Sequence, residues 1–357
     1  MYVEYYLVVK IMKKKKISIA LQGGGAHGAF AWGVMDRLLE DGRFEIMGVS
    51  GTSSGGMNAA SVVQGILEGG NQGGRDKMDA YWRAISDMSA EMKGLPAVHE
   101  IDPDFLNSAQ KLYGINNDMM GKMMSFMMMF ASPEQLNPDN KNPFLEFLKD
   151  FFDYKVFQQN MARRIFLAAT HVKSGKIKIF SNKDMSADVL MASACLPHLF
   201  HTVEVDGEAY WDGGFIANPA IYPLMDLDAT DIIVVQLTKT YCDEVPTTKS
   251  DIVDRLKEIT YNGCLVREMR AIYFISNLID KGLVKEGALT RFNMHIIKSE
   301  ETFKDLKLSS AMNPKWDFIS ALKEAGRKSA DQWIQKYGDS VGKPCDTVNH
   351  DLFKDFV

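Results

Sequence analysis

The stretch Phe44-Glu-Ile-Met-Gly-Val-Ser-Gly-Thr-Ser53-Ser-Gly-Gly-Met-Asn-Ala-Ala60 predicts a strand, a tight turn and the start of a helix. Val49 and its neighbours favour a strand, whereas the small and apolar residues after the turn suit a buried helix. Between them, Gly51 and Gly55 flank Ser53 in a Gly-x-Ser-x-Gly pattern. Because glycine allows a sharp turn without a Cβ clash, this pattern exposes the serine hydroxyl at a helix N-terminus, as a nucleophile requires.

A second glycine-rich turn precedes this stretch. Lys16–Leu21 is expected to form a buried strand, and Gln22-Gly-Gly-Gly-Ala-His-Gly28 leads from it into a helix. Its Gly-x-Gly-x-x-Gly spacing matches a dinucleotide-binding fingerprint, but the following strand lacks the acidic residue that would bind a ribose. The alternative is an oxyanion hole, favoured by the adjacent Ser53, in which bare backbone N–H groups stabilise a tetrahedral intermediate. The candidate donors are Gly23, Gly24 and Gly25.

The order of these elements indicates the fold class. Strand, glycine loop, helix, strand, serine turn and helix follow one another, which is typical of an α/β fold with a parallel sheet. After about residue 250 the pattern becomes mainly helical, with helices expected at Ile252–Ile259 and Leu265–Ile279. A strand at Phe292–Ile297 and an amphipathic helix from Trp316 to Trp333 complete this section. No change in composition marks a linker between domains.

A carboxylate on a second turn is the other candidate group. Val203–Trp211 is expected to form a hairpin, and it leads into Asp212-Gly213-Gly214. A serine nucleophile needs a base, and in one arrangement this base is a histidine after Asp212, either His295 or His350. In the other arrangement Asp212 itself accepts the serine proton, which requires that burial raise its pKa. Sequence patterns alone leave both arrangements open.

Composition excludes several classes of function. The net charge of −5 and the absence of any recognisable RNA- or DNA-binding motif argue against nucleic-acid binding. The four cysteines have neither metal-ligand nor disulfide-framework spacing, so neither a zinc site nor a disulfide framework is expected. No cofactor is expected either, and a reducing, cytoplasmic location is favoured, with or without peripheral membrane attachment. Export without a cleavable leader is also compatible with the sequence. These cysteines are Cys195, Cys242, Cys264 and Cys345.

Two segments remain outside this core. Residues 1–16 resemble a flexible leader ending in four lysines, and Met12 is an alternative start. Residues 117–130 carry pairs of methionines at about helical spacing. Because methionine adapts to irregular apolar partners, this segment is expected to be either a cap helix packed on the core or a lid that contacts lipid.

Taken together, the three motifs resemble the patatin-like phospholipase family. They are Gly23-Gly-Gly-Ala-His-Gly28, Gly51-Thr-Ser-Ser-Gly55 and Asp212-Gly-Gly214, and the intervening stretches Ala192–Pro197 and Tyr210–Pro219 agree. The resemblance extends from about Lys16 to the helix that contains Trp333, and bacterial members are the most similar. It implies a three-layer α/β/α sandwich with a mostly parallel sheet, and a lipid acyl hydrolase that needs no metal.

The same resemblance implies the site residues. Ser53 is expected to be the nucleophile and Asp212 the proton acceptor, with the glycine loop as the oxyanion hole. One residue departs from the family, because His27 stands where an arginine or lysine is usual. The positive charge near the oxyanion or a lipid phosphate is therefore expected to be absent or to depend on pH. The glycines that complete the three motifs are Gly28, Gly51, Gly55, Gly213 and Gly214.

These inferences give four segments and three functional hypotheses. The segments are a leader (1–16), a catalytic core (17–240, with the methionine-rich insertion near 117–130), a helical section of the same domain (241–340) and a tail (341–357). The first hypothesis is a phospholipase A or esterase acting on a lipid or membrane-surface substrate. The second is a nucleotide-binding protein, and the third a weakly active, regulated membrane-associated protein. A protein activator or a homo-oligomer is compatible with all three.

Overall fold

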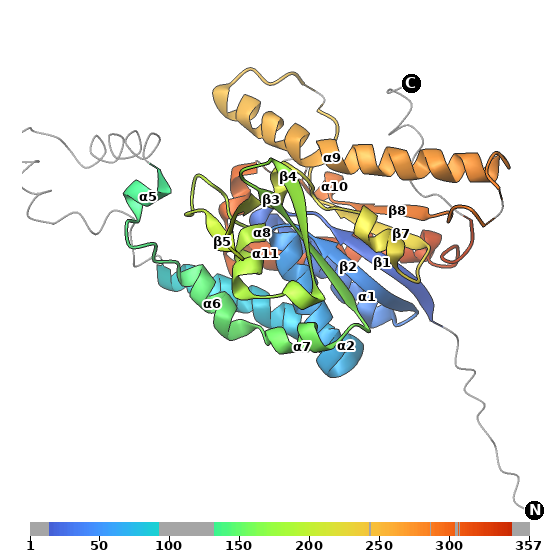
Figure 1. The fold of residues 1–357 in the computed structure, drawn as a ribbon, viewed down its shortest axis with the longest axis horizontal. Helices are drawn as coiled ribbons and strands as arrows, with labels where there is room; N and C mark the ends of the chain where they lie inside the picture. The colour runs from blue at the N-terminus through green and yellow to red at the C-terminus, as the bar shows by residue number, and fades with distance from the viewer. Residues whose placement is uncertain are drawn as a thin grey trace, which may run out of the picture.

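A computed structural model describes residues 14–92 and 132–344, apart from residues 243, 286, 304, 305 and 307 (Figure 1). The predictions for residues 1–13, the methionine-rich segment, Cys345 and His350 lie outside the described residues. The expected α/β fold is confirmed, with a central sheet between layers of helices. Strand β1 begins at Lys15, two residues before the predicted start of the catalytic core.

The described residues form a sheet of eight strands in the order β5-β6-β3-β2-β1-β7-β8, with β4 paired to β3. Strands β3, β2, β1, β7 and β8 run parallel, whereas β4, β5 and β6 are antiparallel additions at one side. The expected mostly parallel sheet is therefore confirmed. The strands are β1 Lys15–Leu21, β2 Phe44–Gly51, β3 Arg164–His171, β4 Lys176–Ser181, β5 Val203–Val205, β6 Glu208–Asp212, β7 Asp231–Gln236 and β8 Asn293–Lys298.

Helices cover both faces of the sheet (Figure 1). Helices α1, α2, α6, α7, α8 and α11 share the larger apolar core with one face, and α9 packs on the other through Leu265, Met269 and Ile272. The helices are α1 Gly28–Asp41, α2 Ser54–Met92, α5 Pro133–Leu136, α6 Pro143–Phe151, α7 Tyr154–Gln159, α8 Ala187–Ser193, α9 Lys249–Asp280, α10 Glu300–Phe303 and α11 Trp316–Tyr337. Short 3-10 turns are η1 Gly25–His27, η2 Asn182–Asp184, η3 Gly213–Phe215, η4 Tyr222–Asp226 and η5 Leu308–Met312.

One predicted division of the chain is wrong. The two helices expected at Ile252–Ile259 and Leu265–Ile279 form one continuous helix, α9, of 32 residues. Buried Asn262 joins the two halves, because its side chain donates to the carbonyls of Thr238 and Lys239 and so fixes the middle of the helix to the loop after β7. Among the described residues, no helix is long and apolar enough to cross a membrane.

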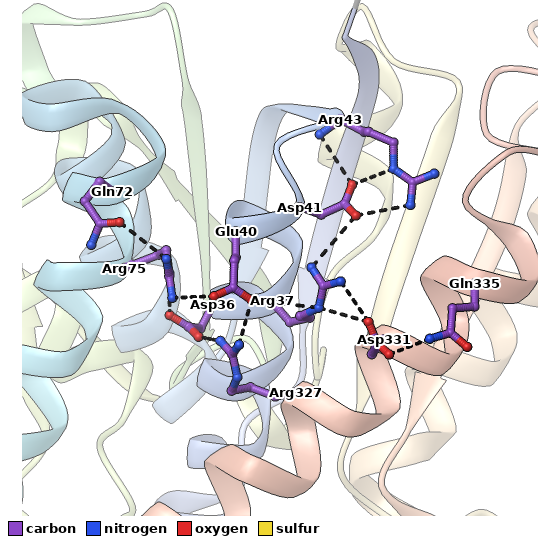
Figure 2. A network of polar contacts seen from close by, with 10 residues as sticks. All are labelled: Asp36, Arg37, Glu40, Asp41, Arg43, Gln72, Arg75, Arg327, Asp331 and Gln335. Carbon is purple, nitrogen blue, oxygen red and sulfur yellow. Dashed lines mark hydrogen bonds and ion pairs between the residues drawn. The ribbon is translucent and has the colours of Figure 1, made fainter.

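An ion-pair network joins α1, α2 and α11 (Figure 2). At its centre Asp36 of α1 is buried, and it binds Arg75 of α2 at 2.8 Å and Arg327 of α11. Glu40, one turn further along α1, accepts hydrogen bonds from the same two arginines at 3.1 and 2.6 Å. Because both arginines are shared by two carboxylates, the three helices are held at a fixed spacing. Of these, α1 begins directly after the glycine loop and α2 directly after Ser53.

Candidate active site

Ser53 occupies a strained turn between β2 and α2. Its φ is 55°, in the left-handed region that few residues other than glycine adopt, and such strain is common at functional positions. The turn is tight because a Cβ on Gly51 would lie 2.3 Å from the carbonyl oxygen of Gly55, and one on Gly55 would lie 2.2 Å from that of Leu21. The Ser53 N–H donates to the carbonyl and hydroxyl oxygens of Ser193, both at 3.1 Å.

Strand β3 positions Asp212 relative to this turn. Gly51, the last residue of β2, pairs with Leu167 of β3, and Asp212, the last residue of β6, pairs with Ala169. Strand β4 occupies the opposite edge of β3, so β2 and β6 share one edge and meet end to end. Because β6 runs antiparallel to β3, its C-terminus points towards the C-terminus of β2. The register on β3 therefore brings Asp212 to the serine turn.

The Asp212 carboxylate is buried, with 3% of the residue exposed. Its backbone N–H donates to the carbonyl of Cys195 at 2.8 Å, and its Oδ1 accepts the Gly214 N–H at 2.6 Å. The Ser53 side chain lies near this carboxylate, in the same cavity, and favours its ionised form. Burial raises the pKa of Asp212 from 3.8 to about 6, although the Gly214 N–H and the nearby Ser53 side chain oppose the shift.

The glycine loop is held by side chains that the motifs do not identify. Asn218, which is buried, accepts the Gly23 N–H at 2.6 Å and donates to the Gly23 carbonyl at 3.3 Å. The Gly24 N–H donates to the Ser54 hydroxyl at 3.0 Å. Two of the three predicted oxyanion-hole donors thus bind protein atoms in this structure. Gly25 adopts φ 59°, and neither its N–H nor that of Ser54 has a hydrogen-bond partner within the described residues.

A cavity of about 210 Å³ collects these groups. Helix α9 closes one side of it with Asp254, Lys257 and Tyr261, none of which the sequence motifs identified. Burial, together with the charge of Asp212, raises the pKa of Tyr261 to about 12, so this phenol stays protonated. The lining residues are Gly23, Gly24, Gly25, Ser53, Leu196, Asp212, Gly214, Asn218, Asp254, Lys257, Tyr261, Ala311 and Met312.

His27 lies outside this cavity and is a buried packing residue. Its Nε2 is 2.7 Å from the Ser310 hydroxyl, and its ring centroid is 4.6 Å from that of Phe303. Burial lowers the pKa of His27 to about 4, so the imidazole is neutral at physiological pH. It therefore provides no positive charge for an oxyanion or a phosphate. Lys257 is the cationic side chain of the described residues that lines the cavity.

The remaining motif glycines allow close packing around the site. A Cβ on Gly28 would lie 2.7 Å from the Ser54 hydroxyl, and one on Gly213 would lie 2.2 Å from the carbonyl oxygen of Ala168. Any side chain at either position would displace the serine turn or the Asp212 turn. Their role here is to allow the turns that bear Ser53 and Asp212 to approach their neighbours.

No histidine of the described residues lines the cavity. His295 is fully buried in β8, where its Nε2 lies 2.9 Å from Asp231 Oδ1. Asp231 is the first residue of β7, at the edge of the sheet opposite the C-terminal ends where Ser53 follows β2. His295 thus belongs to the core, as its apolar strand suggested.

The comparison with known families agrees with this arrangement. A sequence model described as patatin-like phospholipase matches residues 19–225, which include the glycine loop, the serine turn and the Asp212 turn. The chain belongs to this family. At the level of the family it is therefore a lipid acyl hydrolase. None of the curated protein sequences matches this patatin-like chain.

Three solved structures are similar to this patatin-like protein at low sequence identity. VipD from Legionella pneumophila has 16% identity over 91% of this chain and 67% of its own, with a TM-score of 0.42. Two structures of the ExoU–SpcU complex from the type III secretion system of Pseudomonas aeruginosa have 13% and 15% identity over 91% of this chain, with TM-scores of 0.33 and 0.36. The chain spans about half of the matched chains in that complex, 53% and 52%.

Proposed function

We propose that this protein is a phospholipase A or esterase-type hydrolase that cleaves carboxylic esters of lipids through Ser53 and Asp212. The observation that supports this proposal is that Ser53 and the buried Asp212 line the same cavity, together with the glycine loop. Membership of the patatin-like family supports the lipid substrate.

The reaction follows from what each group can accept or donate. Asp212 takes the hydroxyl proton as Ser53 Oγ attacks the acyl carbonyl, and backbone N–H groups stabilise the oxyanion. The N–H groups of Gly25 and Ser54 are available for this role, and the N-terminus of α2 adds its dipole. Collapse of the intermediate expels the alcohol, which receives the proton from Asp212. Water then attacks the acyl-enzyme with Asp212 as base, releasing the fatty acid and restoring Ser53.

The pKa of Asp212 makes a carboxylate adequate as the base. An ordinary aspartate, with a pKa near 3.8, is a weak acceptor, whereas a pKa of about 6 brings it closer to neutrality and leaves it mostly ionised at pH 7. We therefore expect kcat/KM to fall about tenfold for each pH unit below about 6. Lys257 at the cavity wall is the candidate for contact with an anionic head group or phosphate.

The decisive experiment combines a covalent probe with ester hydrolysis. A fluorophosphonate should label Ser53, and both labelling and hydrolysis of a p-nitrophenyl acyl ester should be abolished in Ser53→Ala and reduced at least about a thousandfold in Asp212→Asn. The matched control is a His295→Gln, His350→Gln double variant, which should retain most activity. Near-total loss in that variant would indicate a histidine triad instead.

The same probe separates the alternative functions. Absence of labelling together with saturable binding of a dinucleotide would favour the nucleotide-binding hypothesis. A protein activator, a homo-oligomer, and a location in the cytoplasm or at a membrane remain proposals from the sequence, and activity that appears only on addition of a cell extract would support an activator.

A further inference from the structure

Helix α9 exposes an apolar face on the side opposite its packed face. Leu265, Met269 and Ile272 are buried against the sheet, whereas Leu256 is 58% exposed and Phe274 is 61% exposed. At about 100° per residue, Leu256 and Phe274 both lie about 180° from Leu265 around the helix axis. Further exposed apolar side chains lie within about 60° of them. These are Ile252, Val253 and Ile259, at 42, 40 and 53% exposure.

The charges on α9 are divided between the same two sides. Lys249, Arg267 and Arg270 are exposed and lie within about 40° of Leu256, so they belong to the outward apolar face. Every acidic residue of the helix lies about 120° or more from Leu256, towards the packed side. These acidic residues are Asp251, Asp254, Glu258, Glu268 and Asp280. The outward face of α9 therefore combines exposed apolar side chains with charged residues that are all cations.

We propose that this outward face docks on an anionic lipid surface. A helix that combines exposed apolar side chains with cations on one face is suited to the boundary between head groups and acyl chains. There the apolar side chains enter the acyl region, while lysine and arginine bind lipid phosphates. We call the surface formed by Lys249, Ile252, Val253, Leu256, Ile259, Arg267, Arg270 and Phe274 the α9 face.

A second copy of the chain fits this face poorly. A two-fold dimer across α9 would place this face, whose charged residues are Lys249, Arg267 and Arg270, against an identical face of the same charge. The exposed apolar side chains also occupy a single helix, about 48 Å long, which is narrow for the roughly 800 Å² per partner of a stable protein interface. A lipid surface meets neither objection, because it is planar and supplies the opposite charge.

The position of α9 connects docking with the cavity, and this step rests on the proposed function. Asp254, Lys257 and Tyr261 line the cavity from the first half of the helix. The same half carries Leu256 and Ile259 on the outward face. A helix seated in the head-group layer would hold the Ser53 cavity directly beneath the lipid surface. A lipid ester would then reach Ser53 without crossing bulk water, where exposure of its acyl chains is unfavourable.

Vesicle flotation of the full chain tests this proposal without depending on catalysis, because it can use the Ser53→Ala protein. We expect flotation with vesicles of phosphatidylcholine containing about one third phosphatidylglycerol, and much less with phosphatidylcholine alone. Leu256→Ser, Ile259→Ser should lower the partition coefficient at least about tenfold, because two apolar side chains no longer insert. Arg267→Gln, Arg270→Gln should lower it about fivefold for each charge removed.

Matched substitutions elsewhere are the controls. Leu136→Ser removes an apolar side chain of similar exposure, 49%, on α5, and Lys155→Gln removes an exposed cation on α7. Both should float as the parent does, and thermal melts should show that all variants fold. Flotation of the Leu256, Ile259 double variant equal to that of the parent would overturn the proposal. So would no flotation of the parent, or a dimer that only this double variant converts to a monomer.

The two proposals fail in different ways. Flotation without fluorophosphonate labelling or ester hydrolysis would support the docking surface and refute the proposed chemistry. Hydrolysis of soluble esters without binding to anionic vesicles would support the proposed chemistry and refute the docking surface.

Discussion

Replacing Asp212 with asparagine should stabilise the protein while removing its activity. Asparagine has nearly the same shape, and its Oδ1 can still accept the Gly214 N–H that Asp212 accepts at 2.6 Å. The substitution removes the charge and replaces the second carboxylate oxygen with an NH2 group. Because burial raises the pKa of Asp212 from 3.8 to about 6, the folded state at neutral pH contains an ionised group that the unfolded chain solvates better. That charge therefore lowers the free energy of unfolding.

The size and sign of this effect follow from the pKa. A rise from 3.8 to about 6 corresponds to about 3 kcal/mol, which is an upper value for the gain at pH 7.5. The penalty is fully present above the folded pKa and disappears as the pH falls below the unfolded pKa, because both states are then protonated. At pH 4 the gain should therefore be under about 1 kcal/mol.

Urea unfolding followed by tryptophan fluorescence at pH 7.5 and pH 4 measures both quantities. Asp226→Asn, at an exposed position outside the cavity, is the control and should change the free energy of unfolding by less than about 0.5 kcal/mol at either pH. If Asp212→Asn gave no gain at pH 7.5, or an equal gain at both pH values, burial would not be raising the pKa of this carboxylate.

Two further substitutions test the surroundings of the site. Asn218→Ala removes both side-chain hydrogen bonds to Gly23, so ester turnover should fall about ten- to a hundredfold because the glycine loop can move. The free energy of unfolding, measured with urea, should fall by only about 1 to 2 kcal/mol. Unchanged turnover would contradict this role. Asp36→Ala leaves Glu40 as the one carboxylate that binds both Arg75 and Arg327 among the described residues, so the free energy of unfolding should fall by about 2 to 3 kcal/mol. A loss no larger than that of Glu40→Ala would argue against the buried pair.

Local sequence patterns predicted the elements that carry Ser53 and Asp212. The Gly-x-Ser-x-Gly turn has the expected backbone, with Ser53 at φ 55°, and the hairpin on Asp206-Gly207 ends at Asp212. Both features depend on residues that are neighbours in the chain, where turn chemistry is decided by glycine and by short-range hydrogen bonds. The confirmed α/β class follows from the order of such elements, while the catalytic roles of the two residues stay predictions.

What the sequence could not predict depends on contacts between distant residues. Asn218 binds Gly23 across 195 positions, and no local pattern marks an asparagine as the clamp of a remote loop. His27 was expected to affect charge near the site, but Phe303 and Ser310 bury it elsewhere. The continuity of α9 is another case, because the pattern indicated two helices and Asn262, between them, binds the loop after β7.

The end-to-end meeting of β2 and β6 on β3 has a consequence for how this chain can change. The interval between Ser53 and Asp212 is measured along β3, from Leu167 to Ala169, and not along the 150-odd positions of chain that separate them. Residues inserted or deleted between Met92 and Arg164 leave that interval untouched. Helices α6 and α7 of this region are the exception to free change, because Leu148 and Phe157 are fully buried in the core. Three residues of β3 therefore set the spacing between Ser53 and Asp212, and the length of the chain that joins them does not.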